Sequence, residues 1–166
     1  MTANEAETDP LPAAVQRVAA ALEAAGIAAD IRLLEQRTHT VEEAASALRV
    51  APRQIVKSMV FRGGHEDRLV LVVLAGDRQV DLAKVAAELG EPVVRADPDW
   101  VRERTGFAIG GIPPLAHATP ATVLVDTGIP GDDELWAGAG TSQALFRATG
   151  HQLRAAAGGT VADVGR

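Results

Sequence analysis

Residues 106–114 combine amino-acid types that can bind a carbonyl group or an oxyanion. Gly110 and Gly111 lack side chains, so a ligand can approach their backbone N–H groups closely, whereas Pro113 and Pro114 fix the turn that follows. Backbone donors held in this way stabilise the negative charge that develops on a carbonyl oxygen during acyl transfer. The same residues are also typical of an ordinary turn, and the loop alone leaves both interpretations open.

Lys57 is the second candidate for a chemical role. It lies in the β-rich run from Ile55 to Phe61, where a strand would place Lys57 on the same face as Ile55 and Met59. The opposite face would carry Val56, Ser58 and Val60. A lysine among apolar neighbours either extends to water or protects an exposed strand edge, or it lines a cleft. In a cleft, its compact ammonium would bind a phosphate or orient a substrate hydroxyl.

The other titratable and nucleophilic residues give weaker indications. Lys84 precedes Glu88 by four residues on an expected helix, which predicts a weak surface ion pair. His117 follows the Gly/Pro loop and could reach a site there, but the four histidines lack metal-binding spacing. The chain has no cysteine and no G-x-S-x-G motif, so thiolate chemistry is excluded and no nucleophile is marked. We expect no metal and no cofactor.

A glycine-containing segment at residues 138–142 is predicted to be a turn between two strands that borders a pocket. It resembles a phosphate-binding loop only loosely, because the third spaced glycine and the lysine of a P-loop are missing. Its Gly138, Gly140 and Ser142 therefore join the loop residues Phe107, Ile109, Ile112, Pro113 and Pro114 as candidate substrate-binding positions.

Length and composition predict one globular domain. The chain has 166 residues, 47% of them apolar, and contains no apolar run of the ~18 residues that would cross a membrane. We expect a flexible tail over residues 1–11, a folded domain over residues 12–166, no secretory signal and a cytoplasmic location. A net charge of −6 argues against DNA and against broad nucleic-acid binding, although contact with one nucleic-acid end stays open.

Hydrophobic periodicity and capping residues predict a mixed α/β domain with several strands and short covering helices. The expected helices span residues 12–25, 41–48, 82–89, 98–104 and 152–156, and Thr40, Asp81 and Asp97 begin the middle three. The expected strands span residues 27–34, 55–61, 69–74, 91–94, 121–125, 135–137 and 144–146. The run of residues 69–74 is apolar throughout, which predicts a strand buried on both faces.

Read in order, these segments resemble the YbaK-type aminoacyl-tRNA deacylases, which are related to the editing domain of bacterial prolyl-tRNA synthetases. The matching segments are Ile55–Phe61, Gln79–Val85, Ala96–Pro98, Thr105–Phe107, Gly110–Leu115, Thr122–Asp126 and Gly138–Gly140. Each motif is weak alone, but the ordered set covers roughly residues 12–164. The family often has Tyr at position 107, Ser at 113 and Gly at 116, where this chain has Phe107, Pro113 and Ala116. These departures leave the substrate preference open.

The resemblance implies a curved mixed sheet or partial barrel and an enzyme that hydrolyses the ester of a mischarged tRNA. It also implies that Lys57 is tied to activity and that the loop from Gly110 to Pro114 positions the aminoacyl carbonyl through backbone groups. The expected partner is the acceptor end of aminoacyl-tRNA, with or without a synthetase. Two alternatives stay open: a non-catalytic module that binds an amino acid, nucleotide or synthetase, and a hydrolase of small esters or thioesters.

Overall fold

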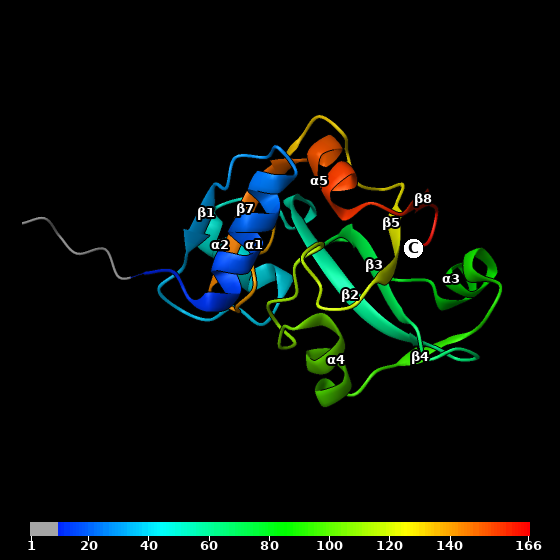
Figure 1. Cartoon of the computed structure of the whole chain (residues 1–166). Coiled ribbons are helices and arrows are strands. Elements are labelled where there is room, and N and C mark those ends of the chain that lie inside the picture. Colours follow the sequence, from blue (N-terminus) through cyan, green and yellow to red (C-terminus); the bar gives the residue numbers. More distant parts are fainter. Residues whose placement is uncertain (1–9) are drawn as a thin grey trace, which may run out of the picture.

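A computed structural model describes residues 10–166 as a mixed sheet of eight strands with five helices around it (Figure 1). The helices are α1 (Ala13–Ala24), α2 (Val41–Leu48), α3 (Leu82–Leu89), α4 (Pro98–Thr105) and α5 (Gly150–Ala157), and a short 3-10 turn spans Pro52–Gln54. The strands are β1 (Ile31–Leu33), β2 (Ile55–Gly63), β3 (Leu69–Ala75), β4 (Val93–Arg95), β5 (Ala121–Asp126), β6 (Glu134–Gly138), β7 (Ala144–Thr149) and β8 (Thr160–Ala162). The predicted mixed α/β class is confirmed, and the predicted tail lies almost wholly outside the described residues.

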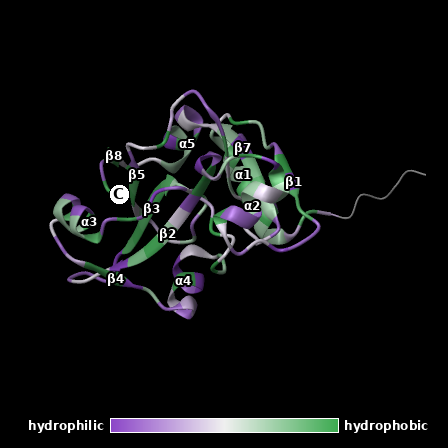
Figure 2. Cartoon of the chain, turned by 180° about the vertical axis from the view of Figure 1, so that it is seen from behind, coloured by the Kyte–Doolittle hydropathy of each residue, from purple (hydrophilic) through white to green (hydrophobic). Residues whose placement is uncertain are grey.

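The strands follow the order β1-β7-β6-β2-β3-β5-β8, and β4 adds to β2 beside this path. The sheet is therefore open, with β1 and β8 at its two ends. Four strand pairs are antiparallel, whereas β2–β6, β3–β5 and β5–β8 are parallel. Every residue of β3 is buried, because β3 lies between β2 and β5 and is covered on both faces. Figure 2 shows β2 and β3 as largely hydrophobic and α4 as largely hydrophilic.

The helix boundaries follow the predicted caps. Thr40 accepts a hydrogen bond from the Glu43 N–H at the start of α2, while the Glu43 carboxylate accepts one from the His39 N–H. In the usual capping box this carboxylate would accept from the N–H of the cap residue Thr40, so here it bonds the residue before the cap. Asp81 and Asp97 cap α3 and α4 through their side chains, and Gly90 and Gly106 end these helices in the left-handed conformation.

Three expectations about local structure were wrong. The strand predicted over residues 27–34 contains only Ile31–Leu33, because the Ile27 N–H bonds the Leu22 carbonyl and so belongs to the turn that ends α1. The short strand β8 was not predicted, and two glycines precede it. Lys84 contacts Asp163 at 3.1 Å and the Gly165 carbonyl at 2.9 Å, and it makes no ion pair with Glu88.

Candidate active site

The sheet forks along one edge of β2, and a cavity lies at the fork. On this edge β6 pairs only with Ile55 and Val56, and β4 pairs only with Phe61–Gly63, so residues 57–60 have no neighbouring strand there. The Gly/Pro loop that follows α4 lies over this gap, and the cavity between them, which is open to solvent, measures about 360 Å³. The fork thus brings an unpaired strand edge and the glycine-rich loop to one site.

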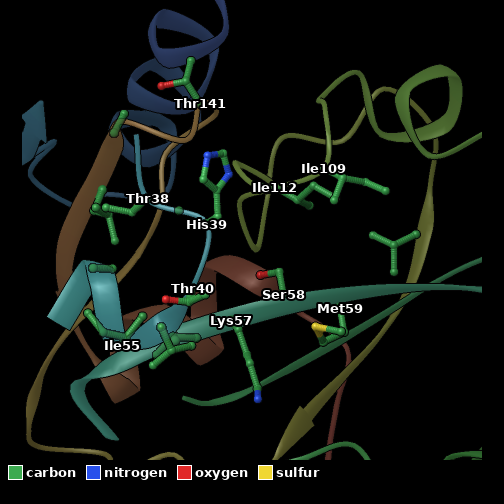
Figure 3. Close-up of a pocket in the computed structure, with 18 of the residues that line it drawn as sticks. Thr38, His39, Thr40, Ile55, Lys57, Ser58, Met59, Ile109, Ile112 and Thr141 are labelled. Atoms are coloured by element: carbon green, nitrogen blue, oxygen red, sulfur yellow. The ribbon is translucent and has the colours of Figure 1, made fainter. Parts of the chain in front are cut away.

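Successive side chains of β2 leave the strand in opposite directions, as the predicted alternation requires. Val56 and Val60 pack on the core beneath α1, whereas Phe61 packs on the core beside α3. In Figure 3 the Ser58 hydroxyl points towards the space below Ile109 and Ile112, and the Lys57 ammonium points the opposite way.

Lys57 lines both the cavity and a neighbouring groove. This groove, called the outer groove below, is lined in part by Lys57, Met59, Phe61, Arg95 and Arg166. The Lys57 ammonium makes no ion pair or hydrogen bond within residues 10–166, in contrast to Lys84. Partial burial lowers the pKa of Lys57 despite the opposing attraction of Glu42 and Asp77. A half-buried lysine without a partner is a candidate for binding an anionic group of a ligand.

The two glycines of the loop serve different purposes. Gly110 is exposed and has φ +102°, a conformation that favours glycine, and its N–H donates to no backbone carbonyl within residues 10–166. Gly111 is buried, and a Cβ added to it would lie 2.5 Å from the Thr141 backbone. The Gly111 N–H donates to the Ala108 carbonyl at 3.3 Å, and its carbonyl accepts from the Gly140 N–H at 2.9 Å. Gly111 thus holds the shape of the loop, whereas the Gly110 N–H has no backbone partner in the described part of the chain.

The predicted site residues fall into three groups. Those that line the cavity are Lys57, Ile109, Gly110, Ile112 and Gly138. Those that line a second pocket are Gly111, Gly140 and Ser142, and Ile109 borders that pocket too. Those that line none of the cavities described here are Phe107, Pro113 and Pro114, all of which are buried. The third group supports the loop from beneath.

His117 stabilises the loop instead of facing the cavity. Its Nε2–H donates to the Pro113 carbonyl at 2.8 Å, and its ring packs edge-on against Phe107 at a centroid distance of 6.5 Å. Burial lowers the pKa of His117, although the hydrogen bond to Pro113 opposes that change, so the neutral ring is favoured. The adjacent Ala116 has φ +69°, which is the left-handed region.

The cavity is also lined by polar residues that were not predicted to belong to the site. They are Thr38, His39, Thr40, Ser58 and Thr141. Ser58 could have been found from the β2 alternation, since it follows Lys57 and faces away from it. The others come from two loops far apart in the sequence, and no local pattern marks them. Across residues 10–166, no three His, Asp or Glu side chains gather in a way that could hold a metal ion. In the same part of the chain, every helix is too short or too polar to cross a membrane.

Comparisons of sequence and of structure both find known proteins that are similar to this chain. Uncharacterized protein YwhH of Bacillus subtilis (strain 168) is 31% identical over 124 residues, covering 75% of this chain and 78% of that protein. A proline–tRNA ligase of Desulfitobacterium hafniense is 33% identical over 96 residues, which are 56% of this chain but only 16% of the ligase. A solved structure described as a candidate trans-editing enzyme for prolyl-tRNA synthetase superposes with a TM-score of 0.87 at 41% identity, covering 95% of this chain and 99% of that one.

The same relationship is found at the level of protein families. The sequence profile of the aminoacyl-tRNA editing domain matches residues 35–156, which include α2, the forked strand β2 and the whole Gly/Pro loop. All the residues that line the cavity therefore lie within the matched segment. The chain belongs to the aminoacyl-tRNA editing domain family.

Proposed function

We propose that this protein is a trans-editing hydrolase that deacylates mischarged aminoacyl-tRNA. A synthetase pocket separates amino acids that differ by one methylene by only about 1–3 kcal/mol, so mischarged tRNA requires a separate hydrolytic check. The family and the trans-editing neighbour support this role. The domain of residues 12–166 would act in the cytoplasm on an acceptor end that is either free or delivered by a synthetase.

One observation carries the proposal: Lys57 and Gly110 both line the cavity at the fork of the sheet, and neither the Lys57 ammonium nor the Gly110 N–H has a hydrogen-bond partner within residues 10–166. A cation without a protein partner is suited to a phosphate or a ribose hydroxyl. A backbone N–H without a partner is suited to a carbonyl oxygen that becomes negative during hydrolysis. Lys57 is thus suited to the phosphate or ribose of a 3′ aminoacyl-adenosine, and the Gly110 N–H to its aminoacyl carbonyl.

In this scheme, the aminoacyl group enters the cavity and its carbonyl oxygen accepts a hydrogen bond from the Gly110 N–H. Lys57 holds the terminal phosphate or the ribose. Water attacks the carbonyl carbon directly, or the substrate's own neighbouring hydroxyl or side chain attacks first and water then hydrolyses the ester, lactone or thiolactone that this forms. The ester C–O bond breaks, the 3′ oxygen of tRNA takes a proton, and hydrolysis releases the free amino acid. The ester is already activated compared with a peptide bond, so no strong protein nucleophile is needed.

The test is a deacylation panel across tRNA charged with alanine, cysteine, serine, threonine or proline, using wild type, Lys57→Ala and Lys57→Arg. We expect Lys57→Ala to lower the rate on the preferred substrate by about 100-fold, a loss typical of removing one electrostatic contact from a hydrolytic site. Lys57→Arg is expected to restore only part of the rate, because the planar guanidinium does not replace a compact ammonium.

Lys84→Ala is the matched control, since Lys84 is the other lysine of the chain and lies on α3 with its ammonium paired to Asp163. It should deacylate at the wild-type rate. Wild-type rates for Lys57→Ala on every substrate would overturn the role of Lys57. Binding of charged tRNA without release of amino acid would favour a non-catalytic module. Hydrolysis of small esters with no effect on charged tRNA would favour a hydrolase of small esters or thioesters.

A further inference from the structure

Ser58 has a buried hydroxyl without a hydrogen-bond partner in the described structure. Its Oγ is shielded from solvent, and no donor or acceptor of residues 10–166 bonds it. Leaving a buried hydroxyl unpaired costs free energy, so such groups are rare and usually have a functional reason. Ser58 is one of the residues that line the cavity, and its side chain lies on the side of β2 that faces the loop (Figure 3).

The other hydroxyls around the cavity are already paired. Thr38 donates to the Ser142 carbonyl at 3.1 Å, and Thr40 accepts from the Glu43 N–H at 3.1 Å. Thr141 accepts from the Gln143 N–H at 3.3 Å. Among the described side-chain hydroxyls that line this cavity, Ser58 is thus the one without any hydrogen bond, and both its donor and its acceptor positions are left for a ligand.

The surroundings of Ser58 indicate a neutral ligand group. The cavity walls are mainly aliphatic, and none of the described residues that line it carries a carboxylate. An α-ammonium buried among these residues would therefore have no opposite charge beside it. A single neutral hydroxyl needs one donor and one acceptor, and a serine side chain provides both.

We propose that Ser58 is a specificity-determining residue that binds the side-chain hydroxyl of the aminoacyl group, so that the site prefers serine or threonine to alanine. This inference rests on the proposed deacylase function and names its substrate class. An alanyl group in the same cavity leaves the Ser58 hydroxyl unpaired, and a site built to hydrogen-bond a hydroxyl discriminates strongly against an analogue that lacks one.

The test compares wild type and Ser58→Ala on Ser-tRNA, Thr-tRNA and Ala-tRNA. We expect Ser58→Ala to lower the rate on the hydroxylated substrates by about 10- to 100-fold, the range expected for losing a buried hydrogen bond, while the rate on Ala-tRNA changes little. Ser46→Ala is the matched control, because Ser46 is exposed on α2 and lies outside the cavity. It should keep the wild-type preference.

A binding measurement separates this inference from the proposed hydrolysis. The ligands are the seryl and alanyl amides of 3′-amino-3′-deoxyadenosine, which resist hydrolysis. Wild type should bind the seryl amide about tenfold more tightly, and Ser58→Ala should remove the difference. If hydrolysis fails while this preference holds, the deacylase proposal fails and the Ser58 assignment stands. Equal binding of both amides by wild type would overturn the Ser58 assignment.

Thermal stability distinguishes recognition from a structural role. Because the Ser58 hydroxyl makes no hydrogen bond in the fold, Ser58→Ala should melt at or above the wild-type temperature. A clear drop in melting temperature, together with equal losses on all three substrates, would mean that Ser58 supports the fold or binds only water.

Discussion

At the scale of single residues, Ala116 is conformationally strained in the segment that follows the Gly/Pro loop. Its φ of +69° lies in the left-handed region, which costs a residue with a Cβ roughly 1–2 kcal/mol. The family resemblance places glycine at this position, and glycine adopts the conformation freely. The departure from the family pattern is therefore a matter of backbone strain, since Ala116 lines none of the cavities described.

We predict that Ala116→Gly stabilises the protein by about 0.5–1 kcal/mol, because the strain removed exceeds the entropy that glycine adds to the unfolded chain. Urea unfolding of both proteins measures this difference. Ala118→Gly is the control: Ala118 is exposed and its φ is not positive, so glycine there should lower stability slightly. An Ala116→Gly variant less stable than wild type would show that the conformation is not strained.

Individual residues also show what the sequence can and cannot predict. The alternation along β2 correctly placed Lys57 and Ser58 on opposite faces, because the period of a strand is a local property. That the Gly111 N–H is bonded inside the loop was not predictable, since this depends on the turn closed by Ala108 and on close packing against Thr141. A pair of adjacent glycines indicates bare backbone but does not reveal which N–H group is free.

At the scale of elements, the Gly/Pro loop depends on His117 for its shape. A loop that presents a backbone donor must be held firmly, since a displacement of about 1 Å from the reacting atoms can cost 100-fold in rate. His117 supplies both a hydrogen bond to Pro113 and ring packing on Phe107. The loop and the segment that follows it thus form one supporting unit.

We predict that His117→Phe, which keeps a ring but loses the N–H donor, lowers the deacylation rate about tenfold and the free energy of unfolding by about 1 kcal/mol.

The same substitution should change how the stability of the protein depends on pH. Because the folded-state pKa of His117 is lowered, its share of stability is complete above the unfolded value near 6.5 and declines as pH falls from there towards the folded value. His117→Phe should therefore lose less stability than wild type between about pH 7 and pH 5.

Chemical unfolding at several pH values and the deacylation assay check both parts. His151→Phe is the control, because His151 is exposed and far from the loop in sequence. It should leave the deacylation rate unchanged. Identical pH profiles for wild type and His117→Phe, with full activity, would contradict the supporting role of His117.

Elements differ in how far the sequence determines them. The fully apolar strand β3 and the capped helices α2, α3 and α4 were predicted because each is specified by its own residues. The short strands β1 and β8 were misjudged, since three residues carry little pattern and their pairing partners lie far away in sequence. The fork at β2 is also non-local, because β4 and β6 come later in the chain and meet the same edge. The candidate site is thus predictable in its parts but not in its assembly.

At the scale of the whole molecule, net charge and local charge oppose each other. The chain carries a net charge of −6, which disfavours binding along a nucleic acid. The outer groove nevertheless contains the cations Lys57, Arg95 and Arg166 against the single side-chain carboxylate of Asp81, and none of the three cations forms an ion pair within residues 10–166. A small cationic groove on an acidic protein is suited to the few phosphates of one acceptor end, which links charge distribution to the proposed substrate.

We predict weak but salt-sensitive binding of an acceptor-end oligonucleotide. Three phosphate contacts on a single strand correspond to a slope of about −2 in a plot of log affinity against log salt concentration. Arg95→Ala and Arg166→Ala should each weaken binding and reduce the magnitude of that slope by about 1 or less, as expected when one phosphate contact is lost. Arg53→Ala, an exposed position outside the groove, should leave the slope unchanged. Tight binding that ignores salt would contradict the groove as a phosphate site, because an affinity that releases no counterions cannot come from these three cations.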